Sequence, residues 1–128
     1  METGKVVMVD DSEICRDFVT MVLEERGYKV IAVGSPLGFS KVLRDERPDL
    51  ALVDVTMPAL RGDKLVELAR RGGGVVCPIV LYSDRPVAEL DGLVQACGAV
   101  GYICKNDNEK ALADSVKKFI QKFRAAPA

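Results

Sequence analysis

Short apolar runs alternate with stretches of helical periodicity five times along this 128-residue chain. Runs rich in β-branched residues and bounded by turn residues are typical of strands buried in a sheet. The predicted strands cover residues 5–9, 28–33, 49–53, 77–82 and 99–104. The run at 49–53 is almost continuously apolar, which indicates burial on both faces and a central position in the sheet.

After each predicted strand, apolar residues recur at the three- and four-residue spacing of one helix face. In chain order, the stripes are Ile14, Phe18, Met21 and Val22; Phe39, Val42 and Leu43; Leu65, Leu68 and Ala69; Leu90, Leu93, Val94 and Cys97; and Leu112, Val116, Phe119, Ile120 and Phe123. The first helix is predicted to run to about Arg26, with Gly27 as a left-handed cap. Ser35 and Pro36 predict the start of the second helix, and Pro48 follows its end.

Strand and helix alternate throughout, so the sequence predicts an α/β fold. Five such units with right-handed crossovers make a doubly wound parallel sheet with helices on both faces. The glycine triplet at 72–74 precedes a strand, whereas a phosphate-binding loop follows one, so we interpret it as a connector. We interpret residues 1–128 as one domain with a core at about 5–124 and a frayed tail from residue 125.

Composition narrows the class of protein. The chain is 48% hydrophobic and 29% charged, which is typical of a globular domain. Its net charge of −1 provides no overall field for nucleic acid, so we expect no such contact. The apolar runs are too short to cross a membrane, and no signal-like segment begins the chain. Four cysteines without metal-binding spacing are interpreted as small buried residues of a cytoplasmic protein.

Polar side chains stand where four of the predicted strands end. They are Asp10 and Asp11 after the first strand, Asp54 after the third, Ser83 after the fourth and Lys105 after the fifth. The carboxyl ends of parallel strands meet at one edge of a sheet, where open α/β sheets bind ligands. We therefore expect these five side chains to converge on one site.

The three carboxylates predict a divalent cation. Two carboxylates about 4 Å apart repel by roughly 4 kcal/mol at an effective dielectric constant near 20. A cluster of three is therefore costly unless a cation fills it, and Mg²⁺ prefers oxygen ligands of this kind together with several waters. Any one of these aspartates taken singly is better explained as a turn or cap residue, and Asp11 or Ser12 is placed to cap the first helix.

The same set of groups suits a phosphoryl group. A metal ion and Lys105 would neutralise its oxygens, and Ser83 would donate a hydrogen bond to it. Asp54 would then be the nucleophile and form an aspartyl phosphate. The chain contains no histidine, which excludes histidine-based acid–base catalysis and Ser–His or Cys–His nucleophile pairs. Taken singly, Lys105 is also explained as a lysine whose aliphatic side chain packs on the core, and Ser83 as the hydroxyl of a turn.

The segment from Asp54 to Gly62, Asp-Val-Thr-Met-Pro-Ala-Leu-Arg-Gly, resembles the phosphoacceptor loop of bacterial response-regulator receiver domains. The typical pattern in that family is Asp-x-x-Met-Pro-x-x-x-Gly. The other features that fit in order and spacing are the pair Asp10-Asp11, Ser83, Gly98-Ala99, Tyr102 and Lys105. The resemblance covers residues 5 to about 124 and implies a flavodoxin-like (βα)5 fold with strand order 2-1-3-4-5.

This resemblance implies a signalling domain of a two-component system rather than an enzyme. It implies that Asp54 accepts a phosphoryl group from a sensor histidine kinase or a phosphotransfer protein. The implied Mg²⁺ ligands are Asp10, Asp11, Asp54 and the backbone carbonyl of Thr56.

The resemblance also implies a switch made of Ser83 and Tyr102. The switch would remodel the face formed by the fourth helix, the fifth strand and the fifth helix, where a downstream protein binds. In the alternative interpretation, Tyr102 is an interfacial aromatic residue whose ring packs on the core.

Two positions depart from the family pattern. Asp84 follows Ser83 where receivers usually carry alanine or glycine, and its carboxylate would oppose a phosphoryl charge unless it points away, for example toward Arg85. Asn106 replaces the proline that commonly follows the lysine, so we expect a trans peptide bond there.

Three other functions are alternatives to a phosphorylated receiver. A pseudo-receiver, which binds partners without phosphate, is favoured by Asp84 and disfavoured by the complete acceptor set. A phosphohydrolase would want a second carboxylate two residues after Asp54, where Thr56 stands. A flavin carrier of similar fold would want a hydroxyl-rich loop after the first strand, and here that loop is acidic.

Overall fold

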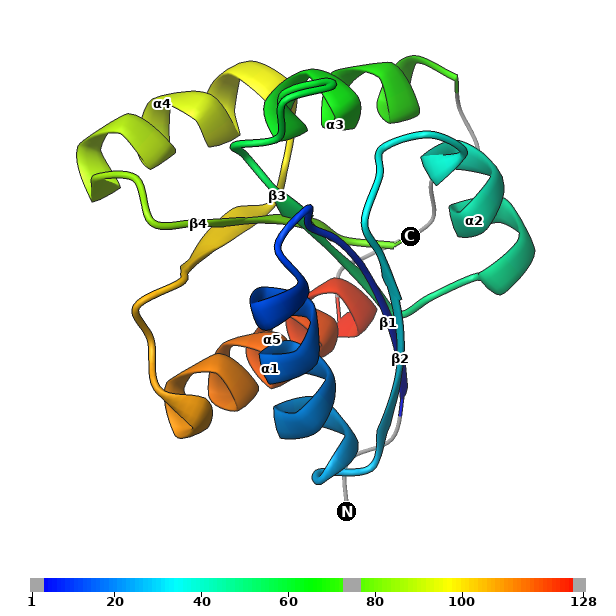
Figure 1. Cartoon of the computed structure of the whole chain (residues 1–128), viewed down its shortest axis with the longest axis vertical. Coiled ribbons are helices and arrows are strands. Elements are labelled where there is room, and N and C mark those ends of the chain that lie inside the picture. The colour runs from blue at the N-terminus through cyan, green and yellow to red at the C-terminus, as the bar shows by residue number, and fades with distance from the viewer. Residues whose placement is uncertain (1–3, 73–76, 126–128) are drawn as a thin grey trace.

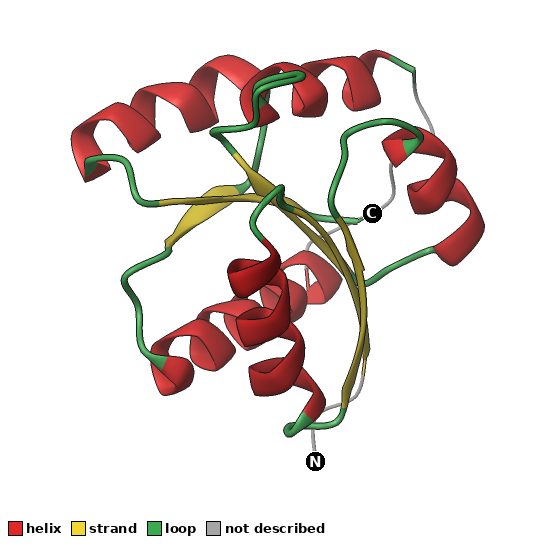
Figure 2. Ribbon diagram, viewed as in Figure 1, coloured by secondary structure: helices red, strands yellow, loops and turns green. Residues whose placement is uncertain are grey.

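A five-stranded parallel sheet lies between two layers of helices in the computed structural model, which describes residues 4–72 and 77–125 (Figure 1). The elements, in chain order, are β1 (Gly4–Val9), α1 (Glu13–Glu24), β2 (Tyr28–Val33), α2 (Phe39–Glu46), β3 (Leu50–Asp54), α3 (Gly62–Arg71), β4 (Ile79–Ser83), α4 (Val87–Cys97), β5 (Gly101–Cys104) and α5 (Glu109–Ala125) (Figure 2). The strand order is β2-β1-β3-β4-β5. The predicted doubly wound α/β fold is confirmed.

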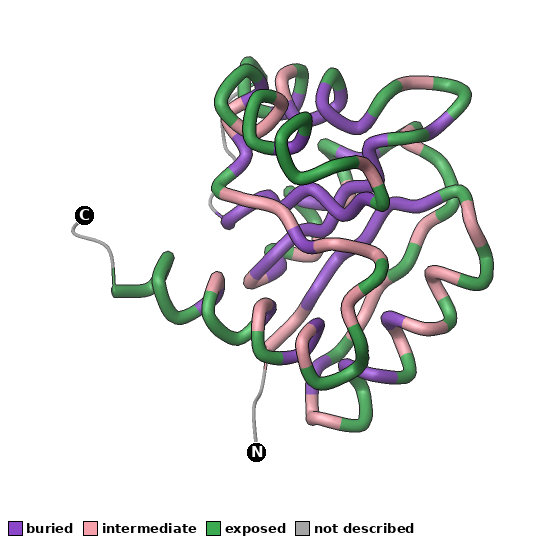
Figure 3. The backbone as a smooth tube through the Cα atoms, turned by 90° about the vertical axis from the view of Figure 1, so that its left-hand side faces the viewer, coloured by how far each residue is buried: buried purple, intermediate pink, exposed green. Residues whose placement is uncertain are grey.

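Helices cover both faces of the sheet, with α2, α3 and α4 on one side and α1 and α5 on the other (Figure 1). Two separate clusters of buried apolar side chains result, one around Phe39 and Leu81 and the other around Leu23 and Leu112. Every residue of β3 and β4 is buried, and Figure 3 shows the buried segments running through the middle of the molecule. The central position predicted for the third strand is therefore confirmed.

The order of the strands places the topological switch point of the sheet between β1 and β3. The chain leaves β1 for β2 on one side and then crosses to β3 on the other, so helices diverge at this point. Val9 pairs with Val53 in the parallel register. Asp10 and Asp54, one residue further along each strand, therefore stand side by side where open α/β sheets bind ligands.

The buried face of α1 differs from the predicted stripe. Val19, Val22 and Leu23 are fully buried, whereas Ile14 is 82% exposed and Met21 is 43% exposed. Val19, Val22 and Leu23 have i, i+3, i+4 spacing and pack as one helix face into the core, which leaves Ile14 exposed to solvent. The helix also ends before the predicted boundary, although Gly27 has the positive φ of 94° that its glycine predicted.

The predicted start of the second helix at Ser35 and Pro36 is wrong. The Ser35 hydroxyl accepts the Leu37 backbone N–H at 3.2 Å, so it closes a local turn instead of capping a helix. Helix α2 begins at Phe39 after Gly38, whose φ of 77° lies in the left-handed region.

Other differences are small. Strands β4 and β5 each begin two residues later than predicted, and β3 is shifted by one residue. Leu68 and Phe123, placed in the predicted stripes, are 52% and 43% exposed. Gly72 follows the end of α3, and the rest of the predicted glycine connector lies outside the described residues.

Three further features of the described residues are the burial of the cysteines, the geometry of the peptide bonds and the apolar length of the helices. Cys77 and Cys97 are buried as predicted, Cys15 and Cys104 are half-buried, and all four thiols are free. Peptide bonds in the described segments are trans, including the one before Asn106. Within residues 4–72 and 77–125, no helix is both long and apolar enough to cross a membrane.

Candidate functional site

Lys105 joins the ends of three strands through its ammonium group. Its Nζ lies 2.9 Å from Oδ2 of Asp10 and 3.2 Å from Oδ1 of Asp54. Both carboxylates are almost completely buried, at 0% and 2% exposure. The same Nζ lies 5.6 Å from the centre of the Tyr82 ring, a cation–π contact that the sequence did not suggest. The structure thus brings these predicted site residues together.

Local hydrogen bonds hold Asp10 in place. Its Oδ1 accepts the Ser12 backbone N–H at 2.9 Å, and its carbonyl oxygen accepts Nη1 of Arg16 at 2.7 Å. Ser12 in turn caps α1, because its hydroxyl accepts the Cys15 N–H at 3.3 Å. Since Ser12 provides the cap, Asp11 is not needed for it, and Asp11 is exposed at the mouth of the site.

The acidic residues fit a metal ion. Carboxylate oxygens of Asp10, Asp11 and Asp54 lie within 4.8 Å of one another. Oδ2 of Asp10 is buried and, despite the nearby ammonium, accepts no well-aligned hydrogen bond from the described residues. A buried oxygen without an aligned donor is costly, and a hard cation relieves that cost. This oxygen-only donor set suits Mg²⁺.

Burial and the neighbouring charges together shift the pKa of Asp54. Burial first, and then the negative charge of Asp10, raise the pKa of Asp54 to about 6, although Lys105 and the Thr56 amide lower it in part. Burial also disfavours the charged form of Lys105, but its close contacts with the negatively charged Asp10 and Asp54 carboxylates outweigh this and raise its pKa. At neutral pH an ionised, buried carboxylate therefore faces a cation, as a nucleophile for an anionic group requires.

The loop after Asp54 depends on Gly62. A Cβ at position 62 would lie 1.9 Å from the Asp54 carbonyl oxygen and 2.7 Å from its carbonyl carbon. The Gly62 N–H donates to the Val55 carbonyl at 3.0 Å, and the Thr56 N–H donates to Oδ1 of Asp54 at 3.1 Å. This close return of the chain explains the glycine of the motif, for which the sequence offered no physical reason.

Ser83 ends β4 at the same edge of the sheet. Its side chain is 1% exposed and lies one residue beyond Tyr82, the register partner of Asp54. Its oxygen accepts the Arg85 N–H at 3.0 Å. The hydroxyl proton is not used in that bond.

Arg85 is a site residue that the sequence suggests only as a partner for Asp84. Its Nε donates to the Thr56 hydroxyl at 3.2 Å, and its Nη1 lies 2.6 Å from Oε1 of Glu89. Asp84 is exposed. The bridge from Arg85 to Thr56 spans 29 residues of sequence, and no local pattern signals it.

Tyr102 lies on the side of the sheet that carries α4. It is half-buried, pairs with Leu81 in the register of β4 and β5, and packs against the apolar cluster on that side. Partial burial and the carboxylate of Asp91, a residue of α4, raise the pKa of its phenol. Tyr102 is therefore placed between the sheet and α4, which is consistent with both of its predicted roles.

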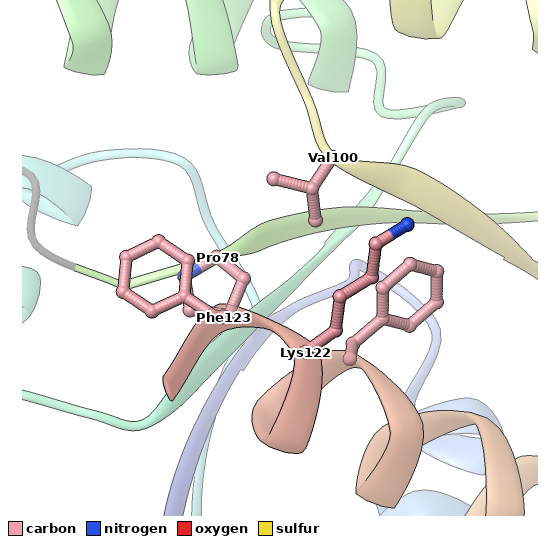
Figure 4. Close-up of a pocket in the computed structure, with 5 residues that line it drawn as sticks. Pro78, Val100, Lys122 and Phe123 are labelled. Carbon is pink, nitrogen blue, oxygen red and sulfur yellow. The ribbon is translucent and has the colours of Figure 1, made fainter. Parts of the chain in front are cut away.

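A second concavity of about 190 Å³ lies at the opposite edge of the sheet (Figure 4). It is lined by Pro78, Val100, Phe119, Lys122 and Phe123. Pro78 and Val100 directly precede β4 and β5, so this pocket is at the amino ends of the strands. Its described lining is apolar except for Lys122 and has no carboxylate, hydroxyl or thiol.

Known proteins resemble this chain over most of its length. The model of the response regulator receiver domain matches residues 6–117. The transcriptional regulatory protein CseB of Streptomyces avermitilis is 29% identical over 122 residues, which are 95% of this chain and 51% of CseB. The DNA-binding response regulator MtrA of Mycobacterium leprae is 27% identical over 124 residues, which are 97% of this chain and 54% of MtrA. The chain thus spans about half the length of these curated relatives.

A solved structure agrees with these relatives. The chemotaxis protein CheY4 of Vibrio cholerae superposes with a TM-score of 0.84 at 26% sequence identity. The match covers 92% of this chain and 99% of the CheY4 chain.

Proposed function

This chain belongs to the response regulator receiver domain family, and we propose that it accepts a phosphoryl group on Asp54 and thereby switches a protein-binding face. Receiver domains are in general signalling domains that interact with histidine kinases or phosphotransfer proteins and bind Mg²⁺ at an acidic pocket. The observation that carries the proposal is the position of Asp54, which is buried and joined to the Asp10 carboxylate through the Lys105 ammonium that contacts both. The site also lies at the carboxyl ends of β1 and β3, where open α/β sheets bind ligands, and this position supports the proposal further.

The proposed reaction moves a phosphoryl group from a phosphohistidine to Asp54. A carboxylate oxygen of Asp54 attacks phosphorus and forms an acyl P–O bond, while the P–N bond breaks. The electron pair of the P–N bond goes to the imidazole nitrogen of the donor, which takes up a proton. Because these 128 residues contain no histidine, the donor imidazole must come from outside them. Oδ1 of Asp54 already accepts from Thr56 and faces Lys105, so Oδ2 is the oxygen that we assign to the attack.

The neighbouring residues stabilise the transferred group. Lys105 would form an ion pair with one phosphoryl oxygen. The Ser83 hydroxyl would donate a hydrogen bond to a second phosphoryl oxygen. Mg²⁺, held by Asp10, Asp11, Asp54 and the Thr56 carbonyl, would neutralise charge on the phosphoryl oxygens as they approach Asp54.

We assign the output to the face formed by α4, β5 and α5, centred on Tyr102. A ligand shifts a two-state equilibrium only by its differential affinity for the two states, so the phosphoryl group must contact an element with two arrangements. Ser83 and Tyr102 are the proposed elements. The exposed apolar residues Val87 and Val100, at 51% and 48% exposure, support protein binding on this face, and we expect no nucleic acid contact by this domain.

A pseudo-receiver is the second candidate. The observation that favours it is Asp84, an exposed carboxylate directly after Ser83. In this alternative the same face binds a partner and Asp54 stays unmodified.

Beryllofluoride, a stable mimic of the phosphoryl group, separates the two candidates. In the presence of Mg²⁺ it should shift the backbone amide resonances of Asp54, Ser83 and Lys105, together with those of residues 87–91 and Tyr102. The Asp54→Asn variant should show none of these shifts. Shifts confined to the acidic pocket of the parent chain would favour the pseudo-receiver.

A further inference from the structure

Arg85 connects the acidic site to the first turn of α4. Its backbone N–H donates to the Ser83 hydroxyl oxygen, and its Nε donates to the Thr56 hydroxyl at 3.2 Å. The backbone N–H of Thr56 in turn donates to Oδ1 of Asp54 at 3.1 Å. At its far end, the guanidinium forms an ion pair with Glu89, whose Oε1 lies 2.6 Å from Nη1. One residue, through its backbone N–H and its side chain, therefore contacts both loops of the site and a helix of the proposed output face.

We propose that Arg85 senses the phosphoryl group: its guanidinium exchanges Glu89 for a phosphoryl oxygen on Asp54 and so releases the first turn of α4. This inference rests on the proposed function, because it requires that Asp54 accept a phosphoryl group. It assigns Arg85 as a second cation for that group, beside Lys105, and as the positioning residue that transmits the modification to α4.

The ion pair with Glu89 is of a kind that exchanges easily. The side chains of Arg85 and Glu89 are 28% and 42% exposed, and ion pairs open to solvent contribute little to stability. A phosphoryl group carries nearly two negative charges and offers oxygens that a guanidinium fork binds in pairs. It therefore competes well against a single carboxylate.

Glu89 loses little when Arg85 leaves it. It lies in the first turn of α4, where a carboxylate interacts favourably with the positive end of the helix dipole. The α4 N-terminus has no side-chain cap, since Pro86 holds that position without a hydrogen bond. Arg85 and Glu89 thus tether this turn to the site in the resting chain, and the exchange removes the tether.

Beryllofluoride affinity, measured with Mg²⁺ on the whole chain, tests the exchange through two substitutions with opposite expectations. Arg85→Ala removes a cation for the ligand and should weaken its affinity about tenfold, which corresponds to about 1.4 kcal/mol. Glu89→Gln removes the competitor and should tighten the affinity about threefold. The matched control is Asp45→Asn, which breaks the exposed i, i+4 pair with Lys41 on α2, outside the proposed output face, and should leave the affinity unchanged.

A second readout follows the tether itself. In Arg85→Ala, beryllofluoride should still shift the amide resonances of the acidic pocket but no longer those of residues 87–91. In Glu89→Gln without ligand, the resonances of residues 87–91 should already have moved toward their ligand-bound positions in the parent chain.

The outcomes distinguish the two proposals. Equal beryllofluoride affinities in the parent chain and both variants, or a weaker affinity in Glu89→Gln, would overturn the role of Arg85 and leave phosphorylation of Asp54 standing. Absence of beryllofluoride binding by the parent chain would overturn both.

Discussion

Gly62 lies against the backbone of Asp54 so closely that a Cβ at position 62 would be 1.9 Å from the Asp54 carbonyl oxygen. Gly62→Ala should therefore displace the loop that carries the acceptor, because the clash is with backbone that cannot rotate away. We expect the free energy of unfolding to fall by about 2–4 kcal/mol and Mg²⁺ binding to weaken with it.

Gly92 offers a matched control for Gly62. It lies inside α4, and a Cβ there would meet no atom within 4 Å. Gly92→Ala should raise the free energy of unfolding by up to about 1 kcal/mol through helix propensity. Chemical denaturation of the two variants checks both expectations, and equal stability would show that the loop at Gly62 relaxes freely.

The raised pKa of Asp54 makes its charge a cost to folding at neutral pH. Because its pKa of about 6 lies above the usual aspartate value of 3.8, the folded chain binds more protons than the unfolded chain between these two values. Its contribution to stability therefore falls as the pH rises from about 4 to about 6. Asp54→Asn should raise the free energy of unfolding at pH 7.5 by about 1–3 kcal/mol and have little effect at pH 4.

Asp49→Asn should show the opposite sign. Burial works to raise the pKa of Asp49, but the Lys5 amide and the Arg124 guanidinium hold that pKa below its usual range. Asp49→Asn should thus destabilise the chain at neutral pH, and the loss should shrink only as the pH falls below the usual carboxyl pKa of 3.8. A pH-independent gain in Asp54→Asn would contradict the electrostatic account of the site.

Proton and metal should compete at the acidic site. If Mg²⁺ binds the ionised form of Asp54, its apparent affinity should fall as the pH drops below about 6, the pKa of that carboxyl. One pH unit below this pKa, the affinity should be about tenfold weaker than at pH 7.5. Amide resonances of Asp10, Asp11 and Asp54 report the titration by NMR. An absence of shifts at millimolar Mg²⁺ would remove the metal from the account.

Asp84 should have a modest and salt-sensitive effect. Its side chain is exposed, and the Arg85 side chain pairs with Glu89. At about 8 Å and an effective dielectric constant of 20, unit charges repel by roughly 2 kcal/mol before screening, and exposure to salt reduces this. Asp84→Ala should therefore tighten beryllofluoride binding about two- to fivefold at low salt and hardly at high salt. Equal affinities at low salt would show that Asp84 does not affect the site.

The residues at strand ends could be predicted because one rule of topology places them. Once the strands are parallel, Asp10, Asp54 and Lys105 must meet at the carboxyl edge, whatever the details of their loops. The strand boundaries were off by one or two residues, yet the site did not depend on them. The α/β fold followed from periodicity, and the strand order followed from the family resemblance.

Features that depend on single side-chain conformations could not be predicted. The bridge from Arg85 to Thr56 joins two loops whose relative positions only the folded sheet defines. The exposure of Ile14 depended on which of two overlapping stripes on α1 packs better against the sheet. The Ser35 hydroxyl accepts the Leu37 N–H in a local turn instead of capping a helix, because the two kinds of hydrogen bond are of similar strength.

The most direct test of the central claim is to locate the phosphoryl group on the chain. The parent chain and Asp54→Asn would be incubated with acetyl phosphate and Mg²⁺, reduced with borohydride, and digested for peptide mass spectrometry. Borohydride converts an aspartyl phosphate to homoserine and so marks the modified residue. We predict homoserine at position 54 in the parent chain and none in Asp54→Asn. Modification at Asp10, Asp11 or Ser83, or an unmodified but folded parent chain, would contradict the assignment of Asp54 as the acceptor.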